Sequence, residues 1–264
     1  MKIGIFDSGI GGISVLNEAF HRLPDQEYIF YADVDHVPYG MKTSEQIIEY
    51  ADDITSFLVS QGADVILIAC NTATAVAADY LRSKNSVPII GMEPAVKPAI
   101  EGSEDGRVLV MATPVTIREN KLHSLLKRVD TQHRVDLLPM PGLVRFAEDE
   151  VFDGEKVDTY IEEQVAVYDK ENYTEIVLGC THFNYFKPAL YKAFGEGIQL
   201  IDGNQGTVKH LAEVLGLEEN PVNEIDIENV NRRTTYLGSG RPANKGEFEK
   251  ILRLHKRLEY VRDL

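Results

Sequence analysis

Cysteine is nearly absent from the sequence, which holds only Cys70 and Cys180 among 264 residues. A disulfide is not expected in a reducing cytoplasm, and two thiols without clustered histidines do not make a zinc site. No run approaches the roughly 18 apolar residues that a membrane span needs, and the first residues lack the basic start and apolar stretch of a signal peptide. We therefore expect a cytoplasmic protein without a metal or a membrane partner.

Basic residues are also scarce, because 27 Lys and Arg stand against 42 Asp and Glu, which gives a formal net charge of −15. With no Lys/Arg-rich segment, the chain is poorly suited to neutralise a phosphate backbone, so we expect no nucleic-acid partner. An acidic small substrate would have to be held by local donors such as helix N-termini, against the overall field. Any anion site must therefore be built locally.

Short β-branched runs alternate with helix-length amphipathic segments nearly from end to end, which is typical of parallel α/β proteins. Near-continuous apolar runs favour strands covered on both faces. The expected strands are 2–7, 28–33, 64–70, 87–92, 107–113, 133–140, 175–180, 198–202 and 234–238. The expected helices are 44–61, 73–84, 115–128, 156–170, 184–194, 206–215 and 245–260, with a polar segment at 218–231.

No low-complexity tract or wide Gly/Ser linker divides the chain, so a domain boundary must fall in an ordinary connection. We place this boundary near residue 96. Residues 96–206 then form a second α/β domain. The closing residues pack back on the first half, so that 1–95 and 207–264 form the first domain.

The two cysteines occupy equivalent places, because each ends an apolar strand and precedes small polar residues that open a helix. Ligands bind beyond the carboxyl ends of parallel strands, and a helix N-terminus lowers the pKa of a thiol from its reference value of ~8.5. A single cysteine at such a position is more often a core residue. A matched pair instead suits inversion of a stereocentre, in which one group removes a proton and another returns one to the opposite face.

A glycine-rich segment, DSGIGGIS, runs from Asp7 to Ser14 after the first strand. Its backbone N–H groups and the Ser8 hydroxyl can bind a carboxylate. It is not a dinucleotide fingerprint, because position 14 is serine, and it lacks the Lys-Ser/Thr pair of a phosphate loop. A structural tight turn, with Asp7 as a helix cap, explains the same residues.

Other polar residues are open to two interpretations. Tyr39 and Gly40, after a proline, form a turn or line a cleft. His182 caps a helix, lies on the surface, or shares protons with the neighbouring thiol or a substrate amine. Asp33 and Glu148 are acidic candidates, although solvated surface carboxylates are the commoner explanation.

Five motifs in order resemble the glutamate racemase group of the aspartate/glutamate racemase family. They are FDSGIGG near the start, PYG at 38–40, ACNTAT at 69–74, GMEPAVKPA at 91–99 and LGCTH at 178–182. The resemblance covers about the first 210 residues. It implies two pseudo-symmetric α/β domains, each with a mostly parallel sheet flanked by helices, and an active site in the cleft between them. It also implies an enzyme without a cofactor or metal that supplies D-glutamate for peptidoglycan in a bacterial cytoplasm.

By this resemblance Cys70 and Cys180 are the acid/base pair, assisted by Asp7 and His182. The implied substrate-binding residues are Asp7, Ser8, Tyr39, Gly40, Asn71, Thr72, Thr181 and His182, with Thr116 in TPVT beside them. Asp33 and Glu148 match acidic site positions of the family. The implied substrate is glutamate, and a homodimer is left open.

Two segments depart from the family's pattern. Ala32-Asp33-Val34-Asp35-His36 stands where the family usually shows Gly-Asp-x-x-Arg, and Phe183-Asn184 stands where Tyr-Pro is usual. Both leave the thiols in place but bear on substrate preference and on the geometry of the cleft mouth. The open alternatives are an aspartate racemase, a decarboxylase or isomerase of small dicarboxylates, and a non-catalytic carboxylate sensor. The paired thiols argue against the sensor, which would need neither.

Overall fold

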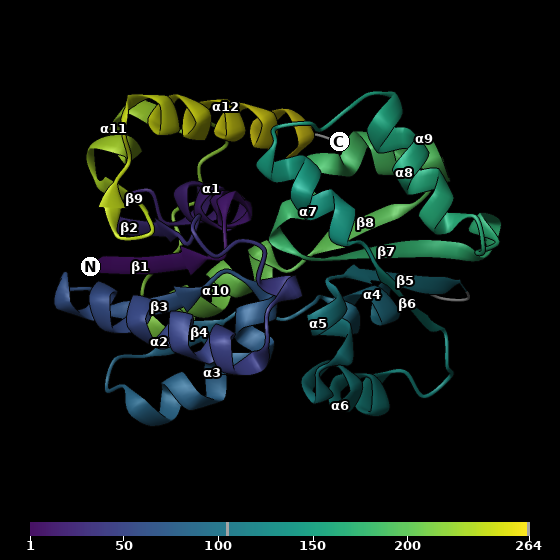
Figure 1. Ribbon diagram of the computed structural model, residues 1–264, viewed down its shortest axis with the longest axis horizontal. Coiled ribbons are helices and arrows are strands. Elements are labelled where there is room, and N and C mark those ends of the chain that lie inside the picture. The colour runs from purple at the N-terminus through teal and green to yellow at the C-terminus, as the bar shows by residue number, and fades with distance from the viewer. Residues whose placement is uncertain (104–105, 263–264) are drawn as a thin grey trace.

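The computed structural model describes residues 1–103 and 106–262, and it has two sheets side by side along the long axis of the molecule (Figure 1). Helices cover both faces of each sheet. The larger sheet has the strand order β10-β9-β2-β1-β3-β4, and the smaller has the order β6-β5-β7-β8. The described pairings are parallel apart from that of β9 with β10. The α/β class and the two mostly parallel sheets expected from the sequence are confirmed.

The elements have the following bounds. The strands are β1 Lys2–Asp7, β2 Glu27–Ala32, β3 Val65–Ile68, β4 Ile89–Gly91, β5 Arg107–Ala112, β6 Val135–Pro139, β7 Tyr173–Gly179, β8 Gln199–Asp202, β9 Thr234–Gly238 and β10 Arg241–Pro242. The α-helices are α1 Ile13–Arg22, α2 Ser44–Ser60, α3 Asn71–Lys84, α4 Val96–Gly102, α5 Pro114–Arg118, α6 Asn120–Val129, α7 Pro141–Glu148, α8 Glu155–Val165, α9 Lys187–Phe194, α10 Asn204–Leu215, α11 Ile227–Arg232 and α12 Lys245–Arg262. The 3-10 helices are η1 Ile10–Gly12, η2 Tyr39–Met41, η3 Lys170–Asn172 and η4 Thr181–Phe186.

The two sheets repeat one strand order, which is the source of the pseudo-symmetry. In β2-β1-β3-β4 and in β6-β5-β7-β8, the first strand in chain order is flanked by the second and the third, and the fourth lies beyond the third. Cys70 follows β3 and Cys180 follows β7, so each cysteine comes after the third strand of its set. In sheets of this order, ligands bind beside the first and third strands at their carboxyl ends.

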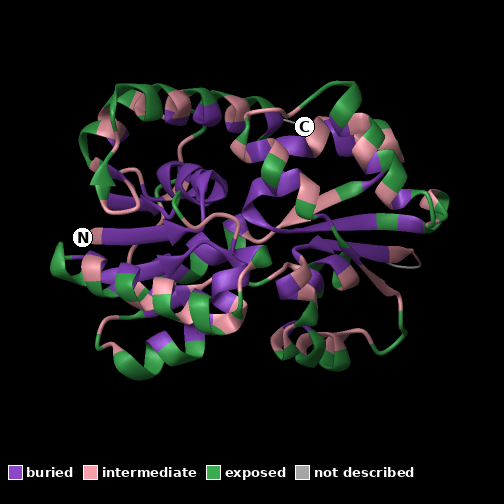
Figure 2. Cartoon of the chain, in the orientation of Figure 1, coloured by how far each residue is buried: buried purple, intermediate pink, exposed green. Residues whose placement is uncertain are grey.

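The central strands are buried because helices cover them on both sides, as Figure 2 shows. All four residues of β3 are buried. Helix α2 buries Ile47, Ala51, Ile54 and Leu58, at the three- and four-residue spacing of an amphipathic helix. Its start is fixed by a reciprocal capping box between Thr43 and Gln46. In the described part of the chain, no helix is long and apolar enough to cross a membrane.

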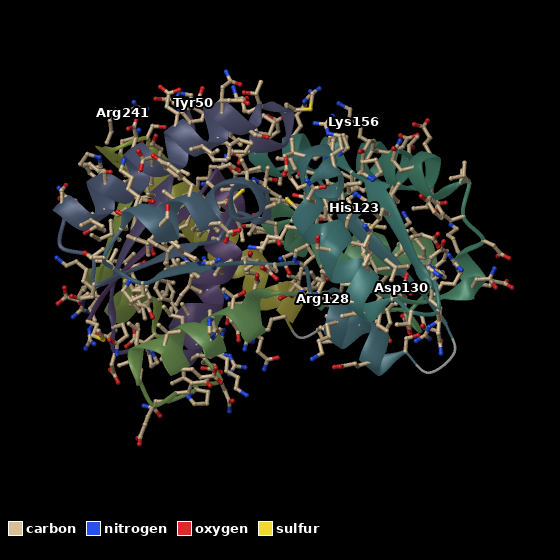
Figure 3. The ribbon with its side chains drawn as sticks, turned by 90° about the horizontal axis from the view of Figure 1, so that it is seen from below. Tyr50, His123, Arg128, Asp130, Lys156 and Arg241 are labelled. Atoms are coloured by element: carbon tan, nitrogen blue, oxygen red, sulfur yellow. The ribbon has the colours of Figure 1, made fainter. Side chains whose placement is uncertain are left out.

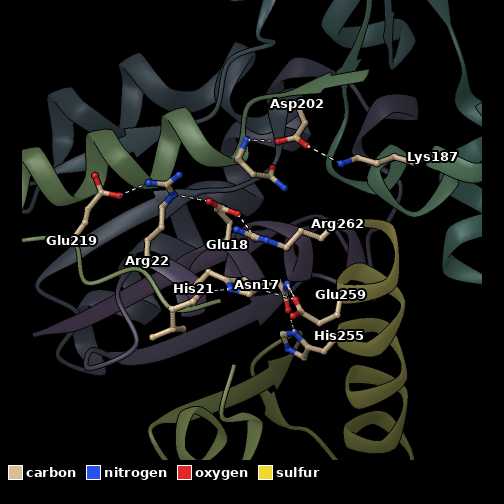
Figure 4. A network of polar contacts seen from close by, with 12 residues as sticks. Asn17, Glu18, His21, Arg22, Lys187, Asp202, Glu219, His255, Glu259 and Arg262 are labelled. Atoms are coloured by element: carbon tan, nitrogen blue, oxygen red, sulfur yellow. Dashed lines mark hydrogen bonds and ion pairs between the residues drawn. The ribbon is translucent and has the colours of Figure 1, made fainter. Parts of the chain in front are cut away.

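The C-terminal segment contacts the first sheet. Strand β9 pairs in parallel with β2, and α12 packs on α1. The contact between α12 and α1 is polar as well as apolar: His255 Nδ1 lies 2.6 Å from Asn17 Oδ1, and Arg262 donates to Glu18 over 2.7 Å (Figure 4). The domain boundaries at residues 95/96 and 206/207 stay a prediction.

Several predicted bounds were wrong. The expected helix 115–128 is two helices, because Glu119 has an extended backbone with ψ of 139°. The first three residues of the expected helix 184–194 belong to the 3-10 helix η4, and the α-helix begins at Lys187. The helix expected at 156–170 ends at Val165. Helices α4 and α7 had no counterpart in the sequence analysis, and α11 lies in the expected polar segment, where the Asp226 side chain caps it.

Candidate active site

Asp7 and Cys70 lie at one edge of the first sheet, because β1 and β3 are neighbours and run in parallel. Cys70 is the N-cap of α3, and its sulfur accepts a hydrogen bond from the N–H of Ala73 over 3.4 Å. The thiol donates to Ser8 Oγ over 3.8 Å. The residue after the first strand therefore contacts the first thiol.

The pKa of Cys70 is raised rather than lowered. Burial is the largest cause, and the negative charge of Asp7 adds to it. The hydrogen bond from Ala73 at the start of α3 opposes this rise but is outweighed. The helix N-terminus therefore acts in the expected direction, but burial outweighs it, and the expectation of a net shift towards the thiolate is wrong for Cys70.

The glycine-rich turn is folded around two carboxylates of the protein itself. Asp7 Oδ2 accepts hydrogen bonds from the N–H groups of Gly9, over 3.2 Å, and Gly12, over 3.0 Å. The N–H of Ile10 donates to Glu148 Oε1 over 2.9 Å. Burial raises the pKa of Asp7, although the charge of His182 and the two N–H groups lower it in part. These three N–H groups hold side chains in place, as the tight-turn interpretation expects.

Cys180 belongs to a chain of three titratable groups. Its sulfur lies 3.7 Å from Nδ1 of His182, whose Nε2 lies 2.8 Å from Oε1 of Glu148. Burial alone would lower the pKa of His182, but the hydrogen bonds with Cys180 and Glu148 outweigh it and raise the pKa well above the ordinary value. Burial opposes the effect of His182 on Glu148, yet the pKa of Glu148 is lowered. These contacts favour the protonated imidazole beside the second sulfur.

The ends of the two sheets touch. Thr181 Oγ1 donates to Asp7 Oδ1 over 3.4 Å, and Ser14 Oγ donates to the carbonyl of Thr181 over 3.3 Å. A Cβ added at Gly11 would lie 2.3 Å from Nδ1 of His182, so glycine is needed for this approach. After burial and the charge of Asp7, a charge on Cys180 also raises the pKa of Cys70.

Three threonine hydroxyls form a cluster on the Cys70 side. Thr72 Oγ1 lies 2.9 Å from that of Thr113 and 3.2 Å from that of Thr116, and the last two are 3.0 Å apart. Gly40 packs against this cluster, since a Cβ there would lie 2.8 Å from Cβ of Thr113. The sequence analysis missed Thr113. Its position directly after β5, which matches that of Ser8 after β1, is the signal that could have found it.

Asn71 opens α3 and is buried, yet neither atom of its carboxamide has a hydrogen-bond partner within the described residues. A buried polar group without a partner costs about 1–3 kcal/mol. A bound ligand that hydrogen-bonds to such a group offsets this cost. Asn71 is therefore the predicted binding residue with the most capacity left for a substrate.

The side chains of Asp33 and Tyr39 form a hydrogen bond with each other. Asp33 is buried, and its Oδ2 accepts the hydroxyl of Tyr39 over 2.6 Å. The same carboxylate accepts from His36 and from Ser239, a residue that the sequence analysis did not single out. Asp33 and Glu148 thus both have hydrogen-bond partners within the fold, and the interpretation as solvated surface carboxylates is wrong for both.

The structure gathers the predicted residues into two groups. Around Cys70 lie Asp7, Ser8, Asn71, Thr72 and Thr116, with Tyr39 and Gly40 beside the threonines. Around Cys180 lie Thr181, His182 and Glu148. Across residues 1–103 and 106–262, no group of three or more His, Cys, Asp and Glu side chains is arranged to hold a metal ion.

Known proteins resemble this chain in sequence and in fold. The glutamate racemase of Lachnospira eligens is 46% identical over 266 residues, with 100% of both chains covered. The structure of Escherichia coli glutamate racemase in complex with L-glutamate and an activator matches with a TM-score of 0.78 at 27% identity, covering 92% of this chain and 99% of that one. Francisella tularensis glutamate racemase in complex with D-glutamate matches with a TM-score of 0.76 at 25% identity, covering 96% and 92%.

The relationship extends over most of the sequence. The family described as Asp/Glu/Hydantoin racemase matches residues 8–211, which hold both cysteines and Glu148, whereas Asp7 directly precedes the matched range. A match of this length, together with a relative 46% identical from end to end, decides the assignment. The chain belongs to the Asp/Glu/Hydantoin racemase family and is an isomerase.

Proposed function

We propose that this enzyme interconverts L- and D-glutamate without a cofactor, using Cys70 and Cys180 as its two proton carriers. One observation carries the proposal: each cysteine follows the third strand of a sheet with the same strand order, and the two sheet ends are joined through Thr181 and Asp7. Inversion of a stereocentre by a two-base route needs one proton carrier on each face of the carbon. The names of the relatives, glutamate racemase, agree with this substrate.

In each direction one cysteine, as thiolate, takes the α-proton and becomes a thiol. The other cysteine, as thiol, gives its proton to the opposite face of the carbanion and becomes the thiolate. The raised pKa of Cys70 suits it to the role of donor when Cys180 removes the proton. The roles exchange when the other enantiomer is bound, so the two half-reactions are mirror images.

Asp7 and His182 assist the cysteine on their own side. Asp7 lies at the end of β1 beside the Ser8–Cys70 contact, and burial raises its pKa, which makes its carboxylate a stronger base than an exposed one. His182 presents Nδ1 to the sulfur of Cys180, and Glu148 holds the ring from the opposite nitrogen. Glu148 is therefore a positioning residue for His182.

The substrate is held by neutral donors, which suits an acidic ligand in a chain of net charge −15. Asn71, with its free carboxamide, and Ser8 bind one end of the amino acid, and Thr181 lies beside them. Tyr39, Gly40, Thr72 and Thr116 form the other end of the pocket. Donors fixed by the fold stabilise the negative charge that develops as the α-proton leaves.

Both thiols are buried, so glutamate enters only when the two sheets separate at the Thr181–Asp7 contact. We assign residues 1–95 with 207–264, and residues 96–206, to the two moving domains. Closure excludes water and strengthens each hydrogen bond to the carbanion. In the cell, we propose, the enzyme works in the cytoplasm and supplies D-glutamate for peptidoglycan, and so supports the bacterial cell wall and cell shape.

Circular dichroism of L- and D-glutamate, incubated with purified enzyme and no added cofactor, tests the proposal. Both enantiomers should converge on zero signal. L-Aspartate and malonate-type acids, followed by optical rotation and by CO₂ release, serve as competing substrates. Faster turnover of aspartate, or release of CO₂, would overturn the assignment of glutamate.

A further inference from the structure

A buried carboxylate outside the catalytic pair holds three side chains at once. Asp33, directly after β2, accepts hydrogen bonds from the Tyr39 hydroxyl over 2.6 Å, from His36 Nδ1 over 2.9 Å and from Ser239 Oγ over 3.1 Å. Its own N–H donates to the carbonyl of Asp7 over 3.0 Å, so it is tied to the end of β1. We name Asp33, His36, Tyr39 and Ser239 the Asp33 cluster. None of the proposed proton transfers uses it directly.

Ser239 reaches this cluster from the turn between β9 and β10, far along the chain. Its backbone has a φ of +43°, a left-handed conformation that non-glycine residues seldom adopt. Its N–H donates to the carbonyl of Ala32 over 2.8 Å, and its Oγ accepts from the N–H of Asp35 over 3.0 Å. The guanidinium of Arg241 binds both carboxylate oxygens of Asp35 over 2.8 and 2.9 Å. The turn therefore clamps the segment after β2 at several points.

His36 is held on two sides. Its ring stacks on Tyr50 of α2, with centroids 3.9 Å apart and planes 14° apart, and this fixes the direction of Nδ1 towards Asp33. Tyr50 also contacts the ring of Tyr39, with centroids 5.9 Å apart. Figure 3 labels Tyr50 and Arg241 at the same end of the molecule, away from His123 and Asp130. The contact with Tyr50 and the hydrogen bond to Asp33 together hold the Tyr39 side chain in place.

The position of Tyr39 sets the position of the next residue. Gly40 lies against Thr113, which bonds with Thr72 and Thr116. A movement of the Tyr39 ring away from Asp33 would carry the Gly40 backbone along and change the distance between this wall and the threonine hydroxyls. The Asp33 cluster is therefore linked, through Tyr39 and Gly40, to the threonine hydroxyls.

We propose that His36 and Ser239 are positioning residues that, through Asp33, hold Tyr39 and Gly40 against the threonine hydroxyls and so fit the pocket to a five-carbon rather than a four-carbon amino dicarboxylate. This inference rests on the proposed function, because it assigns the threonine end of the pocket to the side-chain carboxylate. Neither residue touches the reacting carbon. Their loss should therefore weaken binding and specificity while the proton transfers persist.

His36→Phe and His36→Asn separate the two contacts of the ring. Phe keeps the stacking on Tyr50 but has no donor for Asp33, whereas Asn keeps a donor at the place of Nδ1 and loses most of the stacking. We expect His36→Phe and Ser239→Ala to raise KM for glutamate about tenfold, as the loss of one hydrogen bond to a charged group implies. We expect kcat to stay within about twofold, and His36→Asn to restore KM to within about threefold of the wild-type value.

Substrate specificity distinguishes a positioning role from a general loss of stability, which would not favour one substrate over another. The ratio of kcat/KM for aspartate to that for glutamate should rise in His36→Phe and Ser239→Ala. The control is His210→Phe, since His210 is exposed on α10 and far along the chain from the cluster. The KM of His210→Phe for glutamate and its aspartate-to-glutamate ratio of kcat/KM should equal those of the wild type.

Unchanged KM and unchanged specificity in both variants would overturn the inference, and so would a fall in kcat without a change in KM. Calorimetric titration with D-glutamate keeps this inference separate from the proposed function. A wild-type protein that binds D-glutamate without turnover, with about tenfold weaker binding by the variants, would refute the racemase and support the cluster. A wild-type protein that neither binds nor turns over glutamate would refute both.

Discussion

Thr181 Oγ1 donates a hydrogen bond to Asp7 Oδ1 over 3.4 Å, and this bond joins the end of the smaller sheet to the end of the larger one. Thr181 follows the second cysteine directly, whereas Asp7 ends the strand beside the first. The bond therefore links the residue after Cys180 to the strand beside Cys70. If the two proposed domains separate to admit substrate, this bond must break.

Thr181→Val removes this hydroxyl and keeps the shape of the side chain. We expect kcat/KM for both enantiomers to fall about fivefold to tenfold, as the loss of one buried hydrogen bond of roughly 1 kcal/mol implies. Steady-state kinetics by circular dichroism measures the effect. Thr235→Val is the control, because Thr235 is exposed on β9. An equal loss in the control would show that the hydroxyl of Thr181 is irrelevant.

Gly11→Ala tests the close approach of η1 to η4. The new Cβ would lie 2.3 Å from Nδ1 of His182, so the two segments must move apart. We expect unfolding in urea to require about 1–3 kcal/mol less free energy, as overpacking implies. We also expect most activity to be lost, because His182 leaves Cys180. Gly197→Ala, where no atom lies within 4 Å of an added Cβ, is the matched control and should leave both unchanged.

How much of the structure can be predicted from the sequence depends on whether the deciding interactions are local or long-range. The strand-end positions of Cys70 and Cys180 follow from local apolar patterning, because a parallel strand covered on both faces reads as a continuous apolar run. The helix break at Glu119 and the 3-10 start of η4 are set by tertiary contacts, which propensity does not encode.

Long-range polar pairing is the part that sequence reasoning missed. The partners Ser239 and Asp33 are 206 positions apart, and Glu148 and His182 come from α7 and η4. The N–H groups of the glycine-rich turn also bind Asp7 and Glu148, a choice that depends on the folded position of both carboxylates. Motif resemblance named Asp7, Asp33, Glu148 and His182 but did not pair them, and it did not include Ser239.

The ion pair of Glu148 with His182 predicts a pH window for stability. His182, with its pKa raised above the ordinary 6.5, stabilises the fold fully below pH 6.5 and loses this effect as pH rises through its folded pKa. Glu148, with its pKa lowered below 4.5, stabilises the fold fully above pH 4.5 and loses this effect as pH falls through its folded pKa. The ion pair therefore stabilises the fold most between pH 4.5 and pH 6.5.

Glu148→Gln keeps the shape of the side chain and removes its charge. Its loss of unfolding free energy, relative to the wild type, should be largest between pH 4.5 and 6.5 and should shrink above the raised pKa of His182. Urea unfolding across pH 4 to 10 measures this difference. A deficit that does not vary with pH would contradict the ion pair.

We expect the carboxylate of Asp7 to lower the stability of the fold while it supports turnover. Because burial raises its pKa above 3.8, the ionised carboxylate costs folding free energy, and this cost grows as pH rises from the unfolded pKa through the folded one. Asp7→Asn should therefore raise the melting temperature at neutral pH while lowering turnover. Calorimetry and kinetics on the same sample decide this. A lower melting temperature would show that the carboxylate stabilises the fold.

Exchange of the α-proton with deuterated solvent, followed by proton NMR for Cys70→Ala and Cys180→Ala, tests the central claim most directly. Both variants should lose racemisation, and each should still exchange the α-proton of one enantiomer only, with opposite choices, because one thiol remains on one face of the carbon. Full racemisation by either variant, or exchange of the same enantiomer by both, would contradict an enzyme with one cysteine on each face of its substrate.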